Sequence, residues 1–163
     1  MPPVSADRLV DRESIARTED HSALRIWLRL LTCTQLIERQ VRSRLRERFA
    51  TTLPRFDLMA QLERHHDGLK MNELSRMLMV TGGNVTTIVD QLEHEGLVER
   101  LEGADRRAWL VRLTPAGRKS FAEMARAHED WVVELLAGLS RPEQEDLLEL
   151  LAKVKQHTMG VLS

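Results

Sequence analysis

The sequence predicts a mainly α-helical fold with one small β-hairpin, and three observations indicate it. Apolar residues recur at three- and four-residue steps over most of the chain from Leu24 onward, which is the period of an amphipathic helix. Between residues 97 and 113 the period changes to two, as in a strand. Residues that start or stop helices separate these segments. We therefore expect several helices and one hairpin.

The composition is that of one ordinary domain. The chain has 163 residues, of which 42% are hydrophobic and 30% are charged, so we expect a single core. No apolar run approaches the roughly 18 residues that span a bilayer, and the N-terminus lacks the apolar stretch of a signal peptide. The single cysteine, Cys33, cannot form an internal disulfide. These features predict a cytoplasmic protein without membrane contact.

The first elements are an arm and a long helix. Residues 1–20 are polar and predict a flexible arm, and residues 21–50 predict one helix. At about 1.5 Å per residue this helix is roughly 40 Å long, which exceeds the core of a small domain. We expect it to pack against a second chain. The apolar positions on its single stripe are Leu24, Leu28, Leu31, Ile37, Val41, Leu45 and Phe49.

Residues 51–113, here called the lobe, begin with a helix that carries its own boundary signals. Thr52 can cap it, Pro54 suits its first turn, and Gly68 can end it. A short amphipathic segment follows at residues 72–78. The positions of the first helix that we expect to face inward are Phe56, Met59 and Leu62.

A further helix is predicted to start near Thr81 and to close at Gly96, with Leu97 making the contact of a Schellman ending. Two extended runs then surround Gly103 and Asp105 and predict the hairpin. The apolar residues at helical spacing in that helix are Val85, Ile88, Val89 and Leu92.

Residues 114–163 predict the last two helices. Thr114 and Pro115 provide a cap and a first helical position, and Ser140 with Glu143 forms a capping box for the final helix.

Two short helices joined by a tight turn and followed by a hairpin make a winged helix-turn-helix. Its second helix opens on Thr81, Gly82 and Gly83, although each glycine costs roughly 1 kcal/mol in a helix interior. Small residues let the backbone approach DNA, and unpaired N–H groups at a helix start bind phosphate. The alternative is that the glycines only form the turn between two packed helices.

The polar residues that follow this start are Asn84, Thr86 and Thr87. An asparagine can bond an adenine edge with two hydrogen bonds, and a threonine methyl can contact a thymine methyl. They predict base contacts in a major groove.

Basic residues are gathered in two places although the net charge is −1: residues 39–49 and residues 100–112. Arg106 and Arg107 fall at the tip of the hairpin, where they would suit the negative potential of a narrow minor groove. An exposed arginine pair is otherwise ordinary solvated surface, and Asp105 could brace one of the two.

The chain resembles the MarR family of dimeric bacterial transcription regulators over residues 24–154. The stretches that carry the resemblance are LPRFDLMAQL, NELSRMLMVTGGNVTTIVDQLEHEGLVER, GADRRAWLVRLTPAG and LSRPEQEDLLELL. It implies a homodimer, built by residues 21–50 and 114–163, that binds a pseudo-palindromic site in double-stranded DNA and acts as a repressor. By the same resemblance Arg107 and Arg106 enter the minor groove. Many members have arginine at the position of Thr87, so base contacts should differ here.

A small-molecule effector is the expected signal. Wedged between the helices, it would change the spacing of the two recognition helices and release DNA. Relatives similar in the TGGNVT helix respond to aromatic acids or their coenzyme A thioesters, including hydroxycinnamoyl-type esters. The candidate lining residues are Trp27, Leu31, Arg42, Arg44, Phe56, Met59 and His66, with ordinary core and surface positions as the alternative.

Two other sensing chemistries have weaker support. Cys33 lies where peroxide-sensing relatives carry a reactive cysteine, but the chain has no tyrosine, and a buried inert thiol is the expectation. His65, His66 and Asp67, with His128 elsewhere, lack the spacing of metal ligands. We predict no metal and no cofactor.

Catalysis has no motif to support it, since the sequence lacks a phosphate-binding loop, a nucleophile elbow and a Ser/His/Asp or Cys/His set. We therefore predict that the chain is not an enzyme. The remaining rival is a helical adaptor that binds protein through the winged module. That role would need an apolar exposed patch on the helix at 82–95, where the sequence has Asn84, Thr87 and Gln91.

Overall fold

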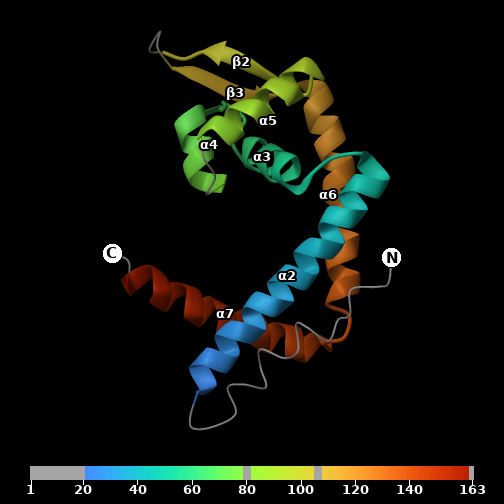
Figure 1. The fold of residues 1–163 in the computed structure, drawn as a ribbon, viewed down its shortest axis with the longest axis vertical. Coiled ribbons are helices and arrows are strands. Elements are labelled where there is room, and N and C mark those ends of the chain that lie inside the picture. The colour runs from blue at the N-terminus through green and yellow to red at the C-terminus, as the bar shows by residue number, and fades with distance from the viewer. Residues whose placement is uncertain (1–20, 79–81, 105–107, 162–163) are drawn as a thin grey trace. The chain divides into compact units, whose positions relative to one another are not determined.

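The computed structural model describes residues 21–78, 82–104 and 108–161, and the chain divides into two compact units, residues 1–128 and 129–163. The elements run in the order α2, α3, β1, α4, α5, β2, β3, α6 and α7. None of the described helices is long and apolar enough to cross a membrane. The mainly helical fold with a small hairpin is confirmed (Figure 1).

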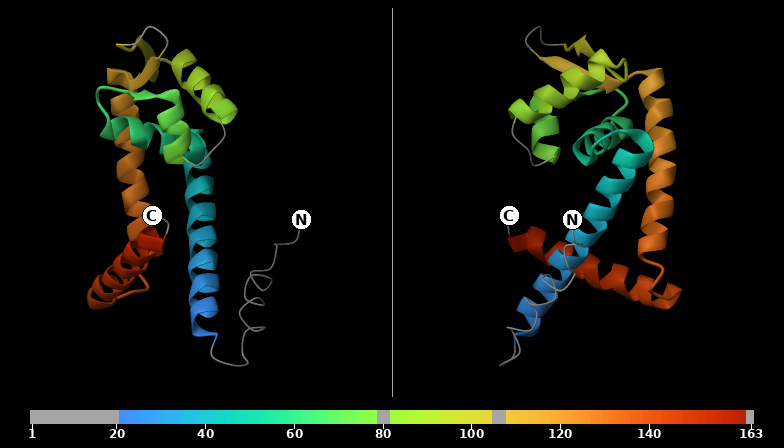
Figure 2. Two further views of the ribbon diagram at one scale, coloured as in Figure 1. Left: turned by 90° about the vertical axis from the view of Figure 1, so that its left-hand side faces the viewer. Right: turned by 45° about the vertical axis from the view of Figure 1, so that its right-hand side comes forward.

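Helix α2 spans Ser22–Phe49 and confirms the long first helix. Figure 2 shows it as one straight rod. Only Val41 and Leu45, near its C-terminal end, are buried in this helix. The apolar side chains of the N-terminal half are therefore half-buried or exposed within the chain. Its exposed large hydrophobic residues are Leu24, Ile26, Trp27 and Leu36.

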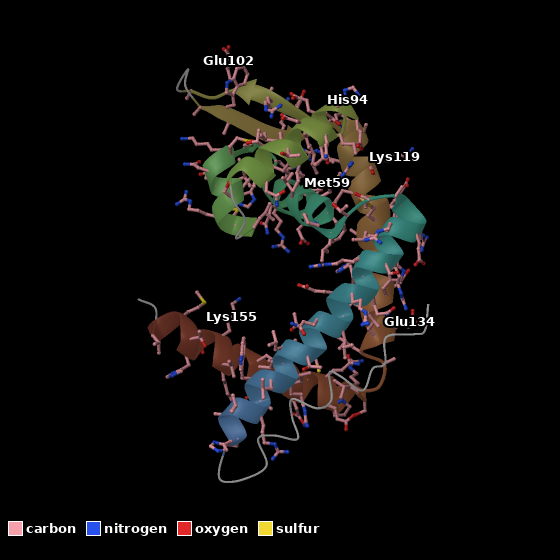
Figure 3. The ribbon with its side chains drawn as sticks, viewed as in Figure 1. Met59, His94, Glu102, Lys119, Glu134 and Lys155 are labelled. Carbon is pink, nitrogen blue, oxygen red and sulfur yellow. The ribbon has the colours of Figure 1, made fainter. Side chains whose placement is uncertain are left out.

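Helix α3 spans Leu53–Arg64, and its predicted inward positions are confirmed. Phe56, Met59 and Leu62 are all buried, and Figure 3 shows Met59 inside the cluster of α3, α4 and α5. The prediction that Gly68 ends this helix is wrong, because the helix stops at Arg64.

Gly68 instead has a φ of +95° in the turn before strand β1, Leu69–Lys70. A Cβ at Gly68 would lie 3.0 Å from the carbonyl oxygen of Val111. Glycine is thus required where the chain enters the sheet, since a side chain is disfavoured by both φ and space.

Helix α4 spans Met71–Leu78 and helix α5 spans Gly82–His94. Leu74 is fully buried in α4. Gly96 has a φ of +73°, and the Leu97 N–H donates to the Leu92 oxygen at 2.9 Å, which is the predicted Schellman ending. The predicted apolar face of α5 is confirmed by the burial of Val85, Ile88, Val89 and Leu92.

The sheet has three antiparallel strands in the order β1-β3-β2, with β2 at Val98–Glu102 and β3 at Trp109–Leu113. The hairpin of β2 and β3 was predicted, and its register pairs Val98 with Leu113. Strand β1 was not predicted, because two residues are too few to show a period.

Helix α6 spans Pro115–Leu135 and begins at the predicted cap. The Thr114 hydroxyl accepts from the Gly117 N–H at 3.0 Å and donates to the Gly96 oxygen at 2.6 Å. A Cβ at Gly117 would lie 1.9 Å from the oxygen of Leu97, so the helix start approaches the end of the Schellman turn too closely for any side chain.

Helix α7 spans Arg141–Val161 and has no buried residue. The predicted capping box is present at its start, where the Ser140 N–H donates to the Glu143 carboxylate at 2.7 Å. The Ser140 hydroxyl donates to the same oxygen at 2.8 Å. These bonds lower the pKa of Glu143 below its ordinary value.

Candidate nucleic-acid interface

Helix α5 has one buried face and one exposed polar face. The three residues predicted to contact bases, Asn84, Thr86 and Thr87, are all exposed. Gly82 and Gly83 form the first two positions of the helix, whereas Thr81 lies outside the described residues. The side chains suited to base contact therefore lie on the exposed face of α5, and the buried apolar face of the same helix packs against the core.

The hairpin lies beside α5, as Figure 1 shows. The Gly103 N–H donates to the Ala108 oxygen at 2.9 Å, and this bond joins the two sides of the hairpin near its end. Arg106, Arg107 and Asp105 fall outside the described residues. Figure 3 shows Glu102, the last residue of β2, at the outer end of the described part of the hairpin.

Arg100 links the hairpin to helix α5, and the sequence analysis did not single it out. Its guanidinium on β2 donates to the carboxylates of Asp90 and Glu93, both on α5. The side chain is 23% exposed, and the hydrogen bond that Arg100 donates to Asp90 is the main reason that the pKa of Arg100 is raised. Because the Arg100 guanidinium binds two carboxylates of α5, it fixes the angle between the hairpin of β2 and β3, which is the wing, and helix α5. The sequence signal that could have predicted this contact is the opposite charge of residue 100 and residues 90 and 93.

A cross-strand ion pair stiffens the hairpin itself. Arg112 Nε donates to the Glu99 carboxylate at 2.6 Å, and the two residues are direct partners in the register of β2 and β3. Just after the C-terminal end of α5, Glu95 forms an ion pair with Arg55 of α3. Exposed pairs contribute little to stability individually, so we assign these pairs a positioning role.

The seven residues predicted to line an effector site are not brought together. Trp27 is 58% exposed and lies 15 residues before Arg42 on α2, a rise of about 22 Å along the helix. Met59 is buried in the core. Phe56 is also buried, and its ring centroid lies 5.4 Å from that of Phe121 and 4.9 Å from that of His128.

The remaining candidates are spread over the same unit. Leu31 and Arg44 are half-buried on α2. His66 accepts a hydrogen bond from Arg118 of α6. Of the seven, Arg42 alone lines either of the two cavities described below.

Two cavities lie along the C-terminal half of α2. One, of about 570 Å³, is lined by α2 residues from Gln35 to Arg46. The other, of about 420 Å³, is a groove between α2, the start of α3 and the exposed face of α5. Arg42 and Arg46 line both cavities.

The structure also shows where the candidate redox and metal-sensing residues lie. The expectation of a buried Cys33 is wrong for the single chain, because this residue is exposed on α2. The ring N–H of His65 donates to the Gln61 oxygen at 2.8 Å, so His65 and His66 have different partners. Within the described ranges no three histidine, cysteine or acidic side chains form a metal-binding group.

Comparison with known proteins gives a consistent result. A profile of the MarR family matches residues 51–108. The chain is 31% identical to the HTH-type transcriptional regulator YkoM of Bacillus subtilis over 94 residues, 57% of this chain and 61% of YkoM. Thus the matched part spans less than two thirds of that relative.

Solved structures agree over a longer stretch. A MarR family transcriptional regulator from Silicibacter pomeroyi is 31% identical, with a TM-score of 0.69, and the match covers 86% of this chain and 95% of that one. Sco3205 from Streptomyces coelicolor, solved in complex with DNA, has a TM-score of 0.72 at 22% identity, covering 86% of this chain and 90% of that one. The second likeness shows the fold alone.

Proposed function

Because this chain belongs to the MarR family of transcription regulators, we propose that it regulates transcription by binding double-stranded DNA. Helix α5 enters the major groove, and the hairpin of β2 and β3 reaches the adjacent minor groove. The observation that carries this proposal is the division of α5 into a fully packed apolar face and an exposed face with Asn84, Thr86 and Thr87. Sco3205, which shares this fold, was solved in complex with DNA, and this supports the proposal that the present chain binds DNA.

Each predicted interface residue has a defined task in this proposal. Asn84 bonds a base edge, and Thr86 and Thr87 contact thymine methyl groups or phosphates. Thr81, Gly82 and Gly83 let the start of the helix approach the backbone. In the wing, Arg106 and Arg107 occupy the minor groove.

The regulator acts as a homodimer on a pseudo-palindromic operator. Support comes from the uncovered apolar residues of α2 and α7, which a second copy would bury. Two winged modules related by a twofold axis bind half-sites about one helical turn, roughly 34 Å, apart.

The proposed effect on transcription is repression that a small molecule relieves. The effector class is an aromatic acid or an aromatic acyl-CoA thioester, which the likeness of the α5 sequence to responsive relatives supports. Such a molecule releases DNA only if it binds the DNA-free arrangement more tightly than the DNA-bound one.

Fluorescence anisotropy tests DNA binding directly. The full chain is titrated into a duplex from immediately upstream of its own gene and into a scrambled duplex, over a salt series. We expect preference for the native duplex and a steep loss of affinity with salt. Asn84→Ala should reduce the preference, and Arg107→Ala should weaken binding. Arg141→Ala, which removes a cation that is 91% exposed at the start of α7, serves as the matched control. Equal, weak binding to both duplexes would favour the protein-binding adaptor instead.

The same complex serves as the effector assay. 4-Hydroxybenzoate, 4-coumarate and 4-coumaroyl-CoA are added to the preformed complex, with coenzyme A alone as the control for the nucleotide part. A fall in anisotropy with one of the aromatic compounds, and none with coenzyme A, is the expected result. A silent panel would contradict the aromatic effector and leave DNA binding intact.

A further inference from the structure

We infer that the groove between α2, α3 and α5 seats a phosphate of the DNA strand beside the major groove that α5 reads. This inference rests on the proposed function and adds a second contact surface to it. The groove is separate from the wing, and its lining includes Arg42 and Arg46 of α2, Thr52, and the α5 residues Asn84, Thr87 and Gln91.

The charge of the groove suits an anion. Three of its lining residues, Arg42, Arg46 and Arg55, are arginines, and among its described lining residues none is acidic. Two of these arginines have acidic partners: Arg42 pairs with Glu38 at 3.1 Å, and Arg55 pairs with Glu95. In contrast, no described residue forms an ion pair or hydrogen bond with the Arg46 guanidinium. Arg46 is therefore the cation most available to an incoming phosphate.

The first turn of α3 adds neutral donors to the same groove. Thr52 caps this helix with an extended backbone, but its side chain makes no cap hydrogen bond, and the first turn has no acidic residue. N–H groups at such a start lack intrahelical acceptors and carry partial positive charge. They supplement the arginines and would bond a phosphate oxygen rather than a base.

The position of the groove on α5 identifies the occupant as DNA. Asn84, Thr87 and Gln91 lie at steps of three and four residues, so they form one stripe along the helix, and this stripe borders the groove. Asp90 and Glu93 of the same helix are held by Arg100 of β2, on the hairpin side. A helix in a major groove about 12 Å wide has a phosphate backbone on each side. The hairpin meets one backbone, and the groove faces the other.

The size of the groove agrees with this assignment. A volume of about 420 Å³ admits a phosphodiester with its bound water, given that one water molecule takes about 30 Å³. Eight of its eleven lining residues have polar or charged side chains, and such side chains supply the hydrogen bonds of a backbone contact that carries no sequence information.

The test is the salt dependence of DNA affinity for Arg46→Ala in the full chain. Each lost phosphate contact should reduce the slope of log affinity against log salt by about 0.9, or about 1.8 for a dimer that uses two grooves. Because phosphate contacts do not depend on sequence, affinity for native and scrambled duplexes should fall by the same factor. Arg46→Lys, which keeps the charge, should retain most of the slope.

Arg39→Ala is the matched control. It removes an exposed arginine of α2 that lines the neighbouring cavity but not the groove, so its slope should equal that of the unmodified protein. Thermal unfolding of each variant confirms that the fold is retained.

The possible failures are distinguishable. If the unmodified protein shows no preference for the native duplex, the proposed function fails. If that preference is present but Arg46→Ala keeps the full slope, the phosphate seat is overturned. A loss of affinity for the native duplex alone would also overturn it, because it would indicate base recognition.

Discussion

The lobe and helix α7 place their apolar side chains in opposite environments. In the lobe, residues from every element meet in one core, and Leu58, Leu74, Val85, Val89, Leu92 and Val111 are fully buried. Helix α7 is as regular a helix but has no buried residue. Its exposed large hydrophobic residues are Leu147, Leu148, Leu150, Leu151, Val154, Met159 and Val161.

The difference indicates which part of the fold can bury its apolar side chains within a single chain. A stripe of leucines is stabilising only when it is removed from water. The lobe achieves this with its own side chains and with Phe121 and His128 of α6, which pack on Phe56, so its geometry is set within the chain. The apolar face of α7 requires a further surface, and in the proposed dimer a second copy supplies it.

The largest expected effect lies in the core of the lobe. Leu74→Ala removes a side chain with 0% exposure and should lower the free energy of unfolding by about 2–5 kcal/mol through lost burial and a cavity. Urea denaturation measures this value. Asn72→Ala, an exposed position of the same helix, should change it by about 0.5 kcal/mol or less. Equal effects at the two positions would refute the packing described for α4.

The next effect lies on α7 and should appear in association rather than in folding of the lobe. Leu150→Glu places a charge at a position that is 58% exposed in the single chain. If this face is buried in a dimer, the dimer dissociation constant should rise at least tenfold, equivalent to about 1.4 kcal/mol. Sedimentation equilibrium measures the constant.

Gln156→Glu is the control for that variant, because it adds the same charge to an exposed polar position of α7 away from the leucine stripe. Its dissociation constant should be nearly unchanged. A monomer at all concentrations for the unmodified protein, or equal weakening by both variants, would contradict the account of α7.

A smaller effect is expected at the cap that joins the hairpin to α6. Thr114→Ala removes the hydroxyl that bonds Gly117 and Gly96, and the loss of such a cap costs about 1 kcal/mol. Thr158→Ala in α7 is the contrasting variant, since the Thr158 hydroxyl donates to the Val154 oxygen within the helix at 2.9 Å. A bond of that kind contributes little. Chemical denaturation should therefore separate the two variants, and equal costs would contradict the role given to the Thr114 cap.

The smallest effect concerns the start of α7 and depends on pH. The N–H and hydroxyl of Ser140 lower the pKa of Glu143 below its ordinary value of 4.5. The unfolded chain consequently binds more protons here, so the stabilisation is fully present above pH 4.5 and is lost as pH falls through the lowered folded-state pKa.

Glu143→Gln keeps an acceptor for the capping box but removes the charge. It should unfold more easily than the unmodified protein near neutral pH and equally easily in strong acid. Denaturation at several pH values measures the difference. A difference that persists in strong acid would contradict the assigned cause.

The local elements were predictable because their signals are local. Thr114 with Pro115, Ser140 with Glu143, and Gly96 with Leu97 each specify a helix end within a few residues, and the structure has all three. Gly68 was misassigned because its conformation is set by the approach of β3, more than 40 residues later in the chain. A sequence pattern that spans a few neighbouring residues cannot predict a contact with a strand so much later in the chain.

The candidate site likewise has local features that the sequence predicts and long-range features that it does not. The exposure of Asn84, Thr86 and Thr87 follows from the helical period of α5 and was predicted. The bonds of Arg100 with Asp90 and Glu93, and the groove beside Arg46, depend on how separate elements pack. Predicted effector residues such as Trp27 and Met59 share an apolar character but not a location.

The most direct test of the central claim, that paired winged modules bind DNA, is hydroxyl-radical footprinting of the duplex upstream of the gene with the full chain. The account predicts two protected segments about one helical turn, roughly 34 Å, apart on one face of the duplex. A single protected segment would contradict the dimeric docking. No protection under conditions where the chain is folded would contradict DNA binding at that site.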